Sequence, residues 1–179
     1  MKPPLENTYW VVPGRMLGGE HPCGENAAET QDRLERLRAA GINYFIDLTE
    51  PGESQDYRAL LPKETHYLRC PIADTEVPDD VAQMQEIQLR IRNALTLGRR
   101  IYVHCRAGIG RTGLIVGCYL AESGIDGASA LKKLNELWQQ SERAKSWPVV
   151  PQTDEQADYI RSWPLRRKLG TGPTRTRPR

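Results

Sequence analysis

The sequence is poor in the features that mark membrane, secreted and metal-binding proteins. No run of about 18 apolar residues is present, so no transmembrane helix is expected. The first ten residues contain two prolines and no apolar core, and a secretory signal is therefore not expected. Four cysteines are spread over 179 residues without the spacing of metal ligands or of a disulfide framework. We expect free thiols, no metal site, no cofactor and a cytoplasmic protein.

Features of a nucleic-acid-binding protein are also scarce. The sequence contains one Phe and no segment in which basic and aromatic residues alternate. Residues 165–179 hold six of the 25 basic residues and no acidic one, which leaves 19 basic against 23 acidic residues elsewhere. Nucleic acid is therefore not an expected partner. The basic segment is low in hydrophobic residues, and we expect it to be a disordered tail rather than a tether.

What the sequence does contain is an alternation of apolar strands and amphipathic helices. β-branched and aromatic runs predict strands within residues 9–19, 42–49, 65–72 and 100–104. Apolar residues spaced by three and four predict helices at 26–41, 78–98, 112–124, 128–140 and 153–163. This order predicts one α/β domain over residues 5–164, with a central, mainly parallel sheet flanked by helices.

The loop between the strand at 100–104 and the next helix carries the clearest chemical pattern, "HCRAGIGRT". At a strand–loop–helix transition, backbone N–H groups and the positive end of the helix dipole point into one concavity. Gly108 and Gly110 let the backbone curl closely. Arg111 offers a planar fork that can bind two phosphate oxygens. These residues predict a cradle for a phosphate group.

Cys105 stands at the start of this cradle, where a positive potential favours the thiolate. Thiols in such settings ionise at about pH 3.5–7.5 instead of roughly 8.5. His104 is expected to hydrogen-bond the local backbone, and the Thr112 hydroxyl to stabilise the sulfur as a leaving group. The alternative, a buried cysteine beside a glycine-rich turn, does not explain why all these residue types occur in order. A nucleotide-binding Gly-Lys-Ser/Thr pattern is absent.

These residues resemble the His-Cys-x5-Arg-Ser/Thr signature of the cysteine-dependent protein tyrosine phosphatase superfamily. The resemblance implies the fold of that superfamily and a phosphocysteine mechanism, with Cys105 as nucleophile and Arg111 binding the transition state. It also implies that the backbone of the loop holds the phosphate. The positions concerned are Arg106, Ala107, Gly108, Ile109, Gly110 and Arg111.

The mechanism needs a proton donor from another segment. Asp74 lies 31 residues before Cys105 in "PIAD", within a loop between a predicted strand and helix. "PIAD…PD" resembles the small dual-specificity branch, including kinase-associated phosphatases, which implies that Asp74 is the general acid. Glu76 is the second candidate, whereas Asp79 and Asp80 stand where they would cap the helix. Asp74 as a plain turn residue is the alternative interpretation.

A further match follows the signature loop. "PQTDEQ" contains Gln-Thr-x-x-Gln, and Gln152 and Gln156 match the glutamines that position the hydrolytic water in the larger tyrosine-specific enzymes. For Gln156 an equally good interpretation is a capping box with Thr153. The Trp-Pro-Asp acid loop of those larger enzymes is absent. The two Trp-Pro pairs, at 147–148 and 163–164, are interpreted as packing and helix-stop features.

The expected function is therefore that of a metal-independent phosphomonoesterase acting on phosphotyrosine in proteins, and on phosphoserine or phosphothreonine as well if its specificity is dual. Two alternatives stay open: a phosphatase for phosphoinositide or RNA 5′ ends, and a phosphate-binding module without turnover. Arg106, Ala107 and Ile109 stand where phosphoinositide phosphatases often have lysines. Cys70 is expected to be a buried structural cysteine, with a redox role beside Cys105 as the alternative.

Overall fold

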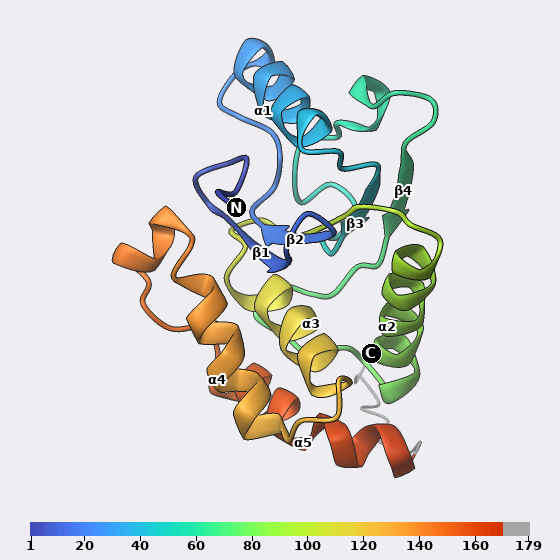
Figure 1. Cartoon of the computed structure of the whole chain (residues 1–179), viewed down its shortest axis with the longest axis vertical. Coiled ribbons are helices and arrows are strands. Elements are labelled where there is room, and N and C mark those ends of the chain that lie inside the picture. The colour runs from blue at the N-terminus through green and yellow to red at the C-terminus, as the bar shows by residue number, and fades with distance from the viewer. Residues whose placement is uncertain (170–179) are drawn as a thin grey trace.

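A computed structural model describes residues 1–169 of the chain, and Figure 1 shows a central sheet with helices on both faces. The strands are β1 Thr8–Val12, β2 Met16–Gly19, β3 Tyr44–Asp47, β4 His66–Arg69 and β5 Ile101–His104. The helices are α1 Ala27–Ala39, α2 Val81–Thr96, α3 Gly110–Ala121, α4 Gly127–Trp138 and α5 Asp154–Leu169, with short 3₁₀ turns at Arg58–Leu60 and Glu142–Lys145. The predicted α/β class is confirmed.

The sheet brings three strand ends together at one edge. Its order is β1-β2-β5-β3-β4, and all neighbours are parallel except the hairpin β1–β2. In register, His104 at the end of β5 lies opposite Gly19 at the end of β2 and Asp47 at the end of β3. The loops that leave these three strands therefore meet, as the carboxyl ends of parallel strands do in ligand-binding α/β folds.

The two faces of the sheet are covered unequally. Helix α1 lies on one face, and helices α2, α3, α4 and α5 lie on the other (Figure 1). Because successive side chains of a strand alternate between faces, Phe45 and Tyr102 join Leu34 and Leu37 in the core under α1. The adjacent residues Ile46 and Val103 belong to the larger core beneath the other helices. A β5 strand buried on both sides holds the following loop firmly in place.

Helix α3 runs through the middle of the larger layer, which explains its apolar sequence. Leu114, Ile115 and Val116 are fully buried. The approach of α5 is so close that a Cβ on Gly117 would lie 2.3 Å from the side chain of Ile160. The helix begins at Gly110, two residues before its predicted start at Thr112. The end of the phosphate-binding motif is therefore itself the first turn of the helix.

Helix α5 is longer than the sequence pattern predicts. Its start is the predicted capping box: Thr153 Oγ1 accepts from Gln156 N at 3.2 Å, and Thr153 N donates to Gln156 Oε1 at 3.3 Å. Its end is at Leu169, with Pro164 inside the helix, so the interpretation of Trp163-Pro164 as a helix stop is wrong. Residues 165–169 of the predicted tail are helical, and the remaining ten residues of that tail lie outside the described residues.

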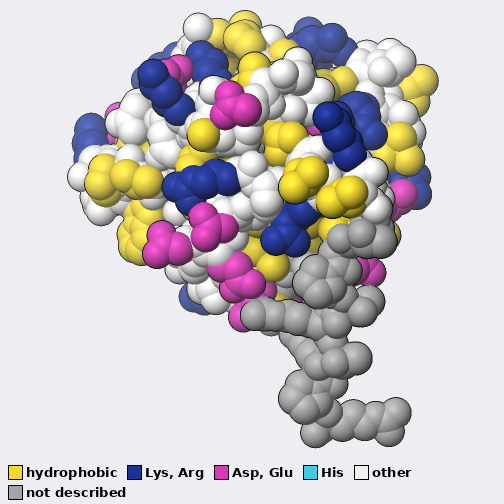
Figure 2. Space-filling model, turned by 90° about the horizontal axis from the view of Figure 1, so that it is seen from below, with side chains coloured by type: hydrophobic (Ala, Val, Ile, Leu, Met, Phe, Trp, Pro, Cys, Tyr) yellow, Lys and Arg dark blue, Asp and Glu magenta, His cyan; other side chains and the backbone are white. Residues whose placement is uncertain are grey.

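The surface seen from below in Figure 2 mixes hydrophobic, basic and acidic side chains and has no large patch of one charge sign on its visible part. In the described part of the chain, no helix is long and apolar enough to cross a membrane.

Candidate active site

The predicted catalytic loop lies where the ends of β2, β3 and β5 meet. Cys105 follows β5 directly and is 3% exposed. Its Sγ accepts a hydrogen bond from the N–H of Gly108 at 3.3 Å. Gly108 has φ +77°, and a Cβ there would lie 2.6 Å from the carbonyl carbon of Gly19. Only glycine meets both requirements, so this residue lets the loop close over the sulfur.

Arg111, in the first turn of α3, is held at the same place although it is 1% exposed. Its Nη1 and Nη2 donate to the two carboxylate oxygens of Glu53 at 2.7 and 2.5 Å, and Nη1 also donates to the carbonyl of Ile72 at 3.0 Å. Its Nε is buried and has no hydrogen-bond partner among the described residues. A buried donor without a partner is costly, so this N–H is available to a further acceptor.

Glu53 is a residue of this site that the sequence analysis did not identify. It lies in the turn after β3 and fixes Arg111 through a paired hydrogen bond. Its own carboxylate also accepts from the N–H of Glu50 at 2.9 Å. Although burial raises it, the pKa of Glu53 is lowered overall, chiefly by the hydrogen bonds from Arg111. The only signal in the sequence was an acidic residue in a loop at the edge where the catalytic strands end.

We expect Glu53→Gln to lower kcat/KM for an aryl phosphate about 10–100-fold. The amide NH₂ takes the place of one carboxylate oxygen, so one of the two charge-assisted hydrogen bonds that hold Arg111 is lost. The measurement is steady-state hydrolysis at pH 7 beside Glu35→Gln, which removes an exposed carboxylate paired with Arg38. An unchanged kcat/KM in Glu53→Gln would show that Arg111 needs no such support.

Asp74 reaches the same site from the loop between β4 and α2. Its Oδ1 lies 2.9 Å from Arg111 Nη2, and its side chain is 54% exposed. The next residue, Thr75, has φ +65°, a conformation that a β-branched residue adopts only under constraint. Helix α5 binds the backbone of the same loop, since Gln156 Nε2 donates to the carbonyl of Glu76 at 3.0 Å. The geometry thus brings Asp74 to the arginine of the catalytic loop, and its role as general acid stays a prediction.

The two glutamines predicted from "PQTDEQ" also lie against the catalytic loop. A Cβ on Gly110 would be 3.1 Å from Gln152 Oε1 and 3.0 Å from Gln156 Oε1. Gln156 is fully buried and at the same time completes the capping box with Thr153. The two interpretations of Gln156 are therefore compatible. Its side chain thus lies between α5, the loop that contains Asp74 and Glu76, and the catalytic loop.

Thr112 makes a different contact from the one expected. Its buried Oγ1 donates to the carbonyl of Gly19 at 3.2 Å, which ties the first turn of α3 to the end of β2. A hydroxyl has one proton to donate. In this arrangement that proton stabilises the loop, so assistance to the leaving sulfur stays a prediction.

His104 lies beneath the loop and is fully buried. Its Nε2 is 2.6 Å from the Tyr57 hydroxyl, and its Nδ1 is 3.4 Å from the carbonyl of Cys105, which is the backbone contact predicted from the sequence. Burial lowers the pKa of His104 to about 4, against the opposing effect of the Asp47 carboxylate. The ring is therefore neutral at pH 7. It serves as a support for the cysteine rather than as a charge beside it.

The burial of neutral His104 predicts a stability that depends on pH. Its pKa is lower in the folded than in the unfolded chain, so the unfolded chain binds the proton more readily between pH 4 and 6.5. Stability is full above pH 6.5 and is lost as the pH falls toward 4, by roughly 3 kcal/mol if His104 acts alone.

The measurement is urea unfolding at several pH values between 4 and 7.5. His104→Gln, which cannot titrate, is expected to flatten this dependence, whereas His66→Gln, at an exposed position in β4, should keep it. Equal slopes in all three proteins would mean that His104 does not carry the effect.

The sheet order, the loop between β5 and α3, and the meeting of cysteine, arginine and aspartate at one edge define the class of cysteine-dependent phosphatases. Residues 5–156 match the family described as PTP-SAK: Swiss Army Knife protein, DSP-PTPase phosphatase domain. Since this match spans most of the chain, the protein belongs to that family of dual-specificity-like phosphatases. The resemblance predicted from "HCRAGIGRT" and "PIAD" is thereby confirmed.

Individual relatives agree with this assignment. The crystal structure of kinase-associated phosphatase, with its catalytic-site cysteine replaced by serine, has the same fold at a TM-score of 0.67 and 22% identity, covering 93% of this chain and 96% of that one. Protein 067L of Invertebrate iridescent virus 3 is 35% identical over 122 residues, 65% of this chain and 47% of that protein. Phosphatidylglycerophosphate phosphatase PTPMT2 of Arabidopsis thaliana is 36% identical over 96 residues, 50% of this chain and 40% of that protein. The chain thus spans about half or less of these two relatives.

Proposed function

We propose that the protein hydrolyses phosphotyrosine in protein substrates through a phosphocysteine intermediate. The observation that carries this proposal is that a cysteine, an arginine and an aspartate from different segments lie at the same loop. Sγ of Cys105 accepts from the loop N–H of Gly108 at 3.3 Å, and Arg111 has a free Nε and lies 2.9 Å from Asp74. A nucleophile, a phosphate-binding fork and an acid are the groups that phosphoryl transfer to cysteine requires.

In the first step, the Cys105 thiolate attacks phosphorus, and the bond from phosphorus to the phenolic oxygen breaks. Asp74 gives its proton to that oxygen, so that tyrosine leaves as a neutral phenol. The phosphate oxygens bind the unpartnered Nε of Arg111 and the neighbouring Nη2, which Asp74 contacts without substrate. The loop N–H groups and the start of α3 stabilise the added negative charge.

In the second step, a water molecule attacks the phosphocysteine. Asp74, now a carboxylate, accepts a proton from that water, the S–P bond breaks, and inorganic phosphate and the thiolate are released. Gln152 and Gln156 lie beside Gly110, where their amides can hold the water. Asp74 thus acts as acid and then as base in one cycle.

The depth of the nucleophile favours an aryl substrate. Cys105 is 3% exposed, so the phosphorus has to enter the loop before the sulfur can reach it. The phenyl ring of phosphotyrosine carries its phosphate farther from the peptide backbone than serine or threonine does. Phosphatidylglycerophosphate is the second candidate substrate, because the PTPMT2 relative is named as a phosphatase for it. Its terminal phosphate likewise stands away from the bulk of the molecule, at the end of a flexible headgroup.

A substrate panel tests this proposal. We expect the highest kcat/KM on a phosphotyrosine peptide, compared at equal concentration with a phosphothreonine peptide, phosphatidylglycerophosphate, a phosphoinositide and a 5′-phosphorylated RNA. Faster turnover of either lipid or of the RNA would overturn the protein-substrate assignment. Tight binding of the phosphotyrosine peptide without hydrolysis of any ester would favour the binding-module alternative.

A further inference from the structure

The outer side of the catalytic loop is held by an ion pair that the mechanism above does not use. Arg143, in the 3₁₀ turn Glu142–Lys145, donates from Nη1 to the carbonyl of Ala107 at 2.6 Å and from Nη2 to Glu20 Oε2 at 2.8 Å. Glu20 directly follows β2, and Arg143 is 36 residues beyond Ala107 in the sequence. Arg143 therefore links the Ala107 carbonyl of the loop to the residue that follows β2.

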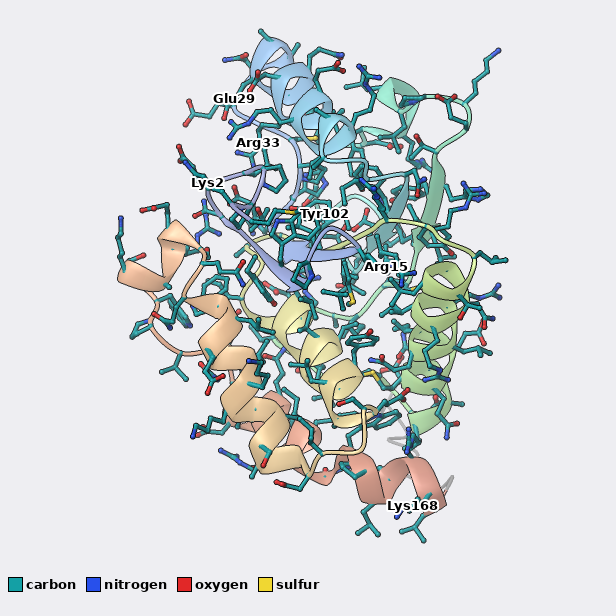
Figure 3. All side chains as sticks on the ribbon, viewed as in Figure 1. Lys2, Arg15, Glu29, Arg33, Tyr102 and Lys168 are labelled. Carbon is teal, nitrogen blue, oxygen red and sulfur yellow. The ribbon has the colours of Figure 1, made fainter. Side chains whose placement is uncertain are left out.

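The Glu20 carboxylate is itself fixed from two further sides. Arg33 of α1 donates to its Oε1 at 2.6 Å, and Asn7 donates to its Oε2 at 3.0 Å. Its backbone carbonyl accepts from the hydroxyl of Tyr102. Arg33 and Tyr102 lie on the α1 side of the sheet (Figure 3). The acceptor that orients Arg143 is thus rigid, and little freedom is left for the guanidinium.

The contact at Ala107 has a consequence inside the loop. In a trans peptide the C=O and the N–H point in opposite directions. The Ala107–Gly108 peptide has its carbonyl on Arg143 outside, and its N–H on the Cys105 sulfur inside at 3.3 Å. The preceding carbonyl, that of Arg106, accepts from the N–H of His21 at 3.0 Å. Two successive carbonyls are held outward, which turns the N–H groups of Ala107 and Gly108 toward the phosphate position.

We infer that Arg143 is a positioning residue that orients and polarises the Ala107–Gly108 peptide, so that its N–H binds the Cys105 thiolate and then the substrate phosphate. A permanent cation on the carbonyl draws electrons from the amide and makes its N–H a stronger donor, as in chains of coupled hydrogen bonds. This inference rests on the proposed function in one respect, namely that the loop binds a phosphate group. It extends the site by two residues, Arg143 and Glu20, that no signature motif contains.

The test compares Arg143→Met and Arg143→Lys with Arg92→Met, which removes an arginine from an ion pair with Glu122 far from the loop. The first readout is the rate of Cys105 alkylation by iodoacetamide as a function of pH. We expect Arg143→Met to raise the pH midpoint of this rate by about 0.5–1, and to weaken protection by inorganic phosphate about 5–10-fold. Arg143→Lys should restore part of both effects, and Arg92→Met should change neither.

A second variant keeps the test decisive if Arg143→Met does not fold. Glu20→Gln leaves Arg143 in place but removes the charge that orients it, and we expect a smaller shift in the same direction. The inference is overturned if the folded variants keep the wild-type alkylation midpoint and phosphate protection, or if Arg92→Met shifts them equally.

Failure of the proposed function would look different. Alkylation and phosphate protection need no turnover, so a shifted midpoint in a protein that hydrolyses no ester would support the role of Arg143 and reject the phosphatase assignment. Normal hydrolysis in a folded Arg143→Met with an unshifted midpoint would reject the role of Arg143 alone.

Discussion

Cys105→Ser is expected to reduce hydrolysis of an aryl phosphate by roughly 10⁴–10⁶-fold, the order observed when a catalytic nucleophile is removed. A serine hydroxyl stays protonated at neutral pH, and unlike a thiolate it is a poor nucleophile and a poor leaving group. The loop that surrounds the side chain is unchanged by this substitution, since the N–H of Gly108 can donate to oxygen as it does to Sγ. Binding of a phosphotyrosine peptide should therefore persist while turnover is lost.

The matched control for this variant is Cys23→Ser. Cys23 is a free, partly exposed cysteine outside the catalytic loop, whose thiol donates to the carbonyl of Gln55. It should retain wild-type kcat. Hydrolysis by Cys105→Ser within tenfold of the wild-type rate would mean that another group attacks phosphorus.

Asp74→Asn is expected to lower kcat by roughly 10²–10⁴-fold with a phosphotyrosine peptide, the usual range for the loss of a general acid. The amide retains a contact with Arg111 but can neither give a proton to the leaving oxygen nor take one from water. The effect on the first step should shrink with a nitrophenyl phosphate, because nitrophenolate leaves without a proton. Stopped-flow and steady-state rates on both substrates measure this difference.

Glu76→Gln tests the alternative acid. Glu76 lies two residues further along the same loop, and its backbone carbonyl already binds Gln156. We expect Glu76→Gln to keep most of the activity. A normal kcat in Asp74→Asn together with a large loss in Glu76→Gln would reverse the assignment.

The sequence was sufficient for the parts of the site that one continuous segment builds. The strand at 100–104, the turn at Gly108 and the helix that follows are encoded locally, so "HCRAGIGRT" predicted the strand–loop–helix transition that the structure contains. Residue patterns likewise placed each α-helix and strand of the described chain to within a few residues at its start, but not the two 3₁₀ turns. The boundary of α5 was missed because the last turn holds through contacts that no apolar pattern reports: Arg166 donates to Ser162 Oγ and lies over the ring of Tyr159.

Residues that act across the fold could not be predicted in this way. Glu53 lies 58 residues from its partner Arg111, and Arg143 lies 36 residues from its partner Ala107. Neither Glu53 nor Arg143 belongs to a recognisable motif. Asp74 was found only through the resemblance of "PIAD" to a known branch, since the turn in which it lies could equally have contained an inert aspartate. Side-chain contacts between distant loops depend on strand order and register, which hydrophobic patterning does not determine.

The most direct test of the account is chemical identification of the intermediate. In Asp74→Asn, a nitrophenyl phosphate should load the enzyme because its leaving group needs no proton, while hydrolysis of the intermediate is slow because the base is missing. Rapid acid quenching followed by peptide mass spectrometry is predicted to find phosphate on the peptide that contains Cys105. Nitrophenol released in this variant with no phosphate on Cys105 at any quench time would contradict the phosphocysteine mechanism.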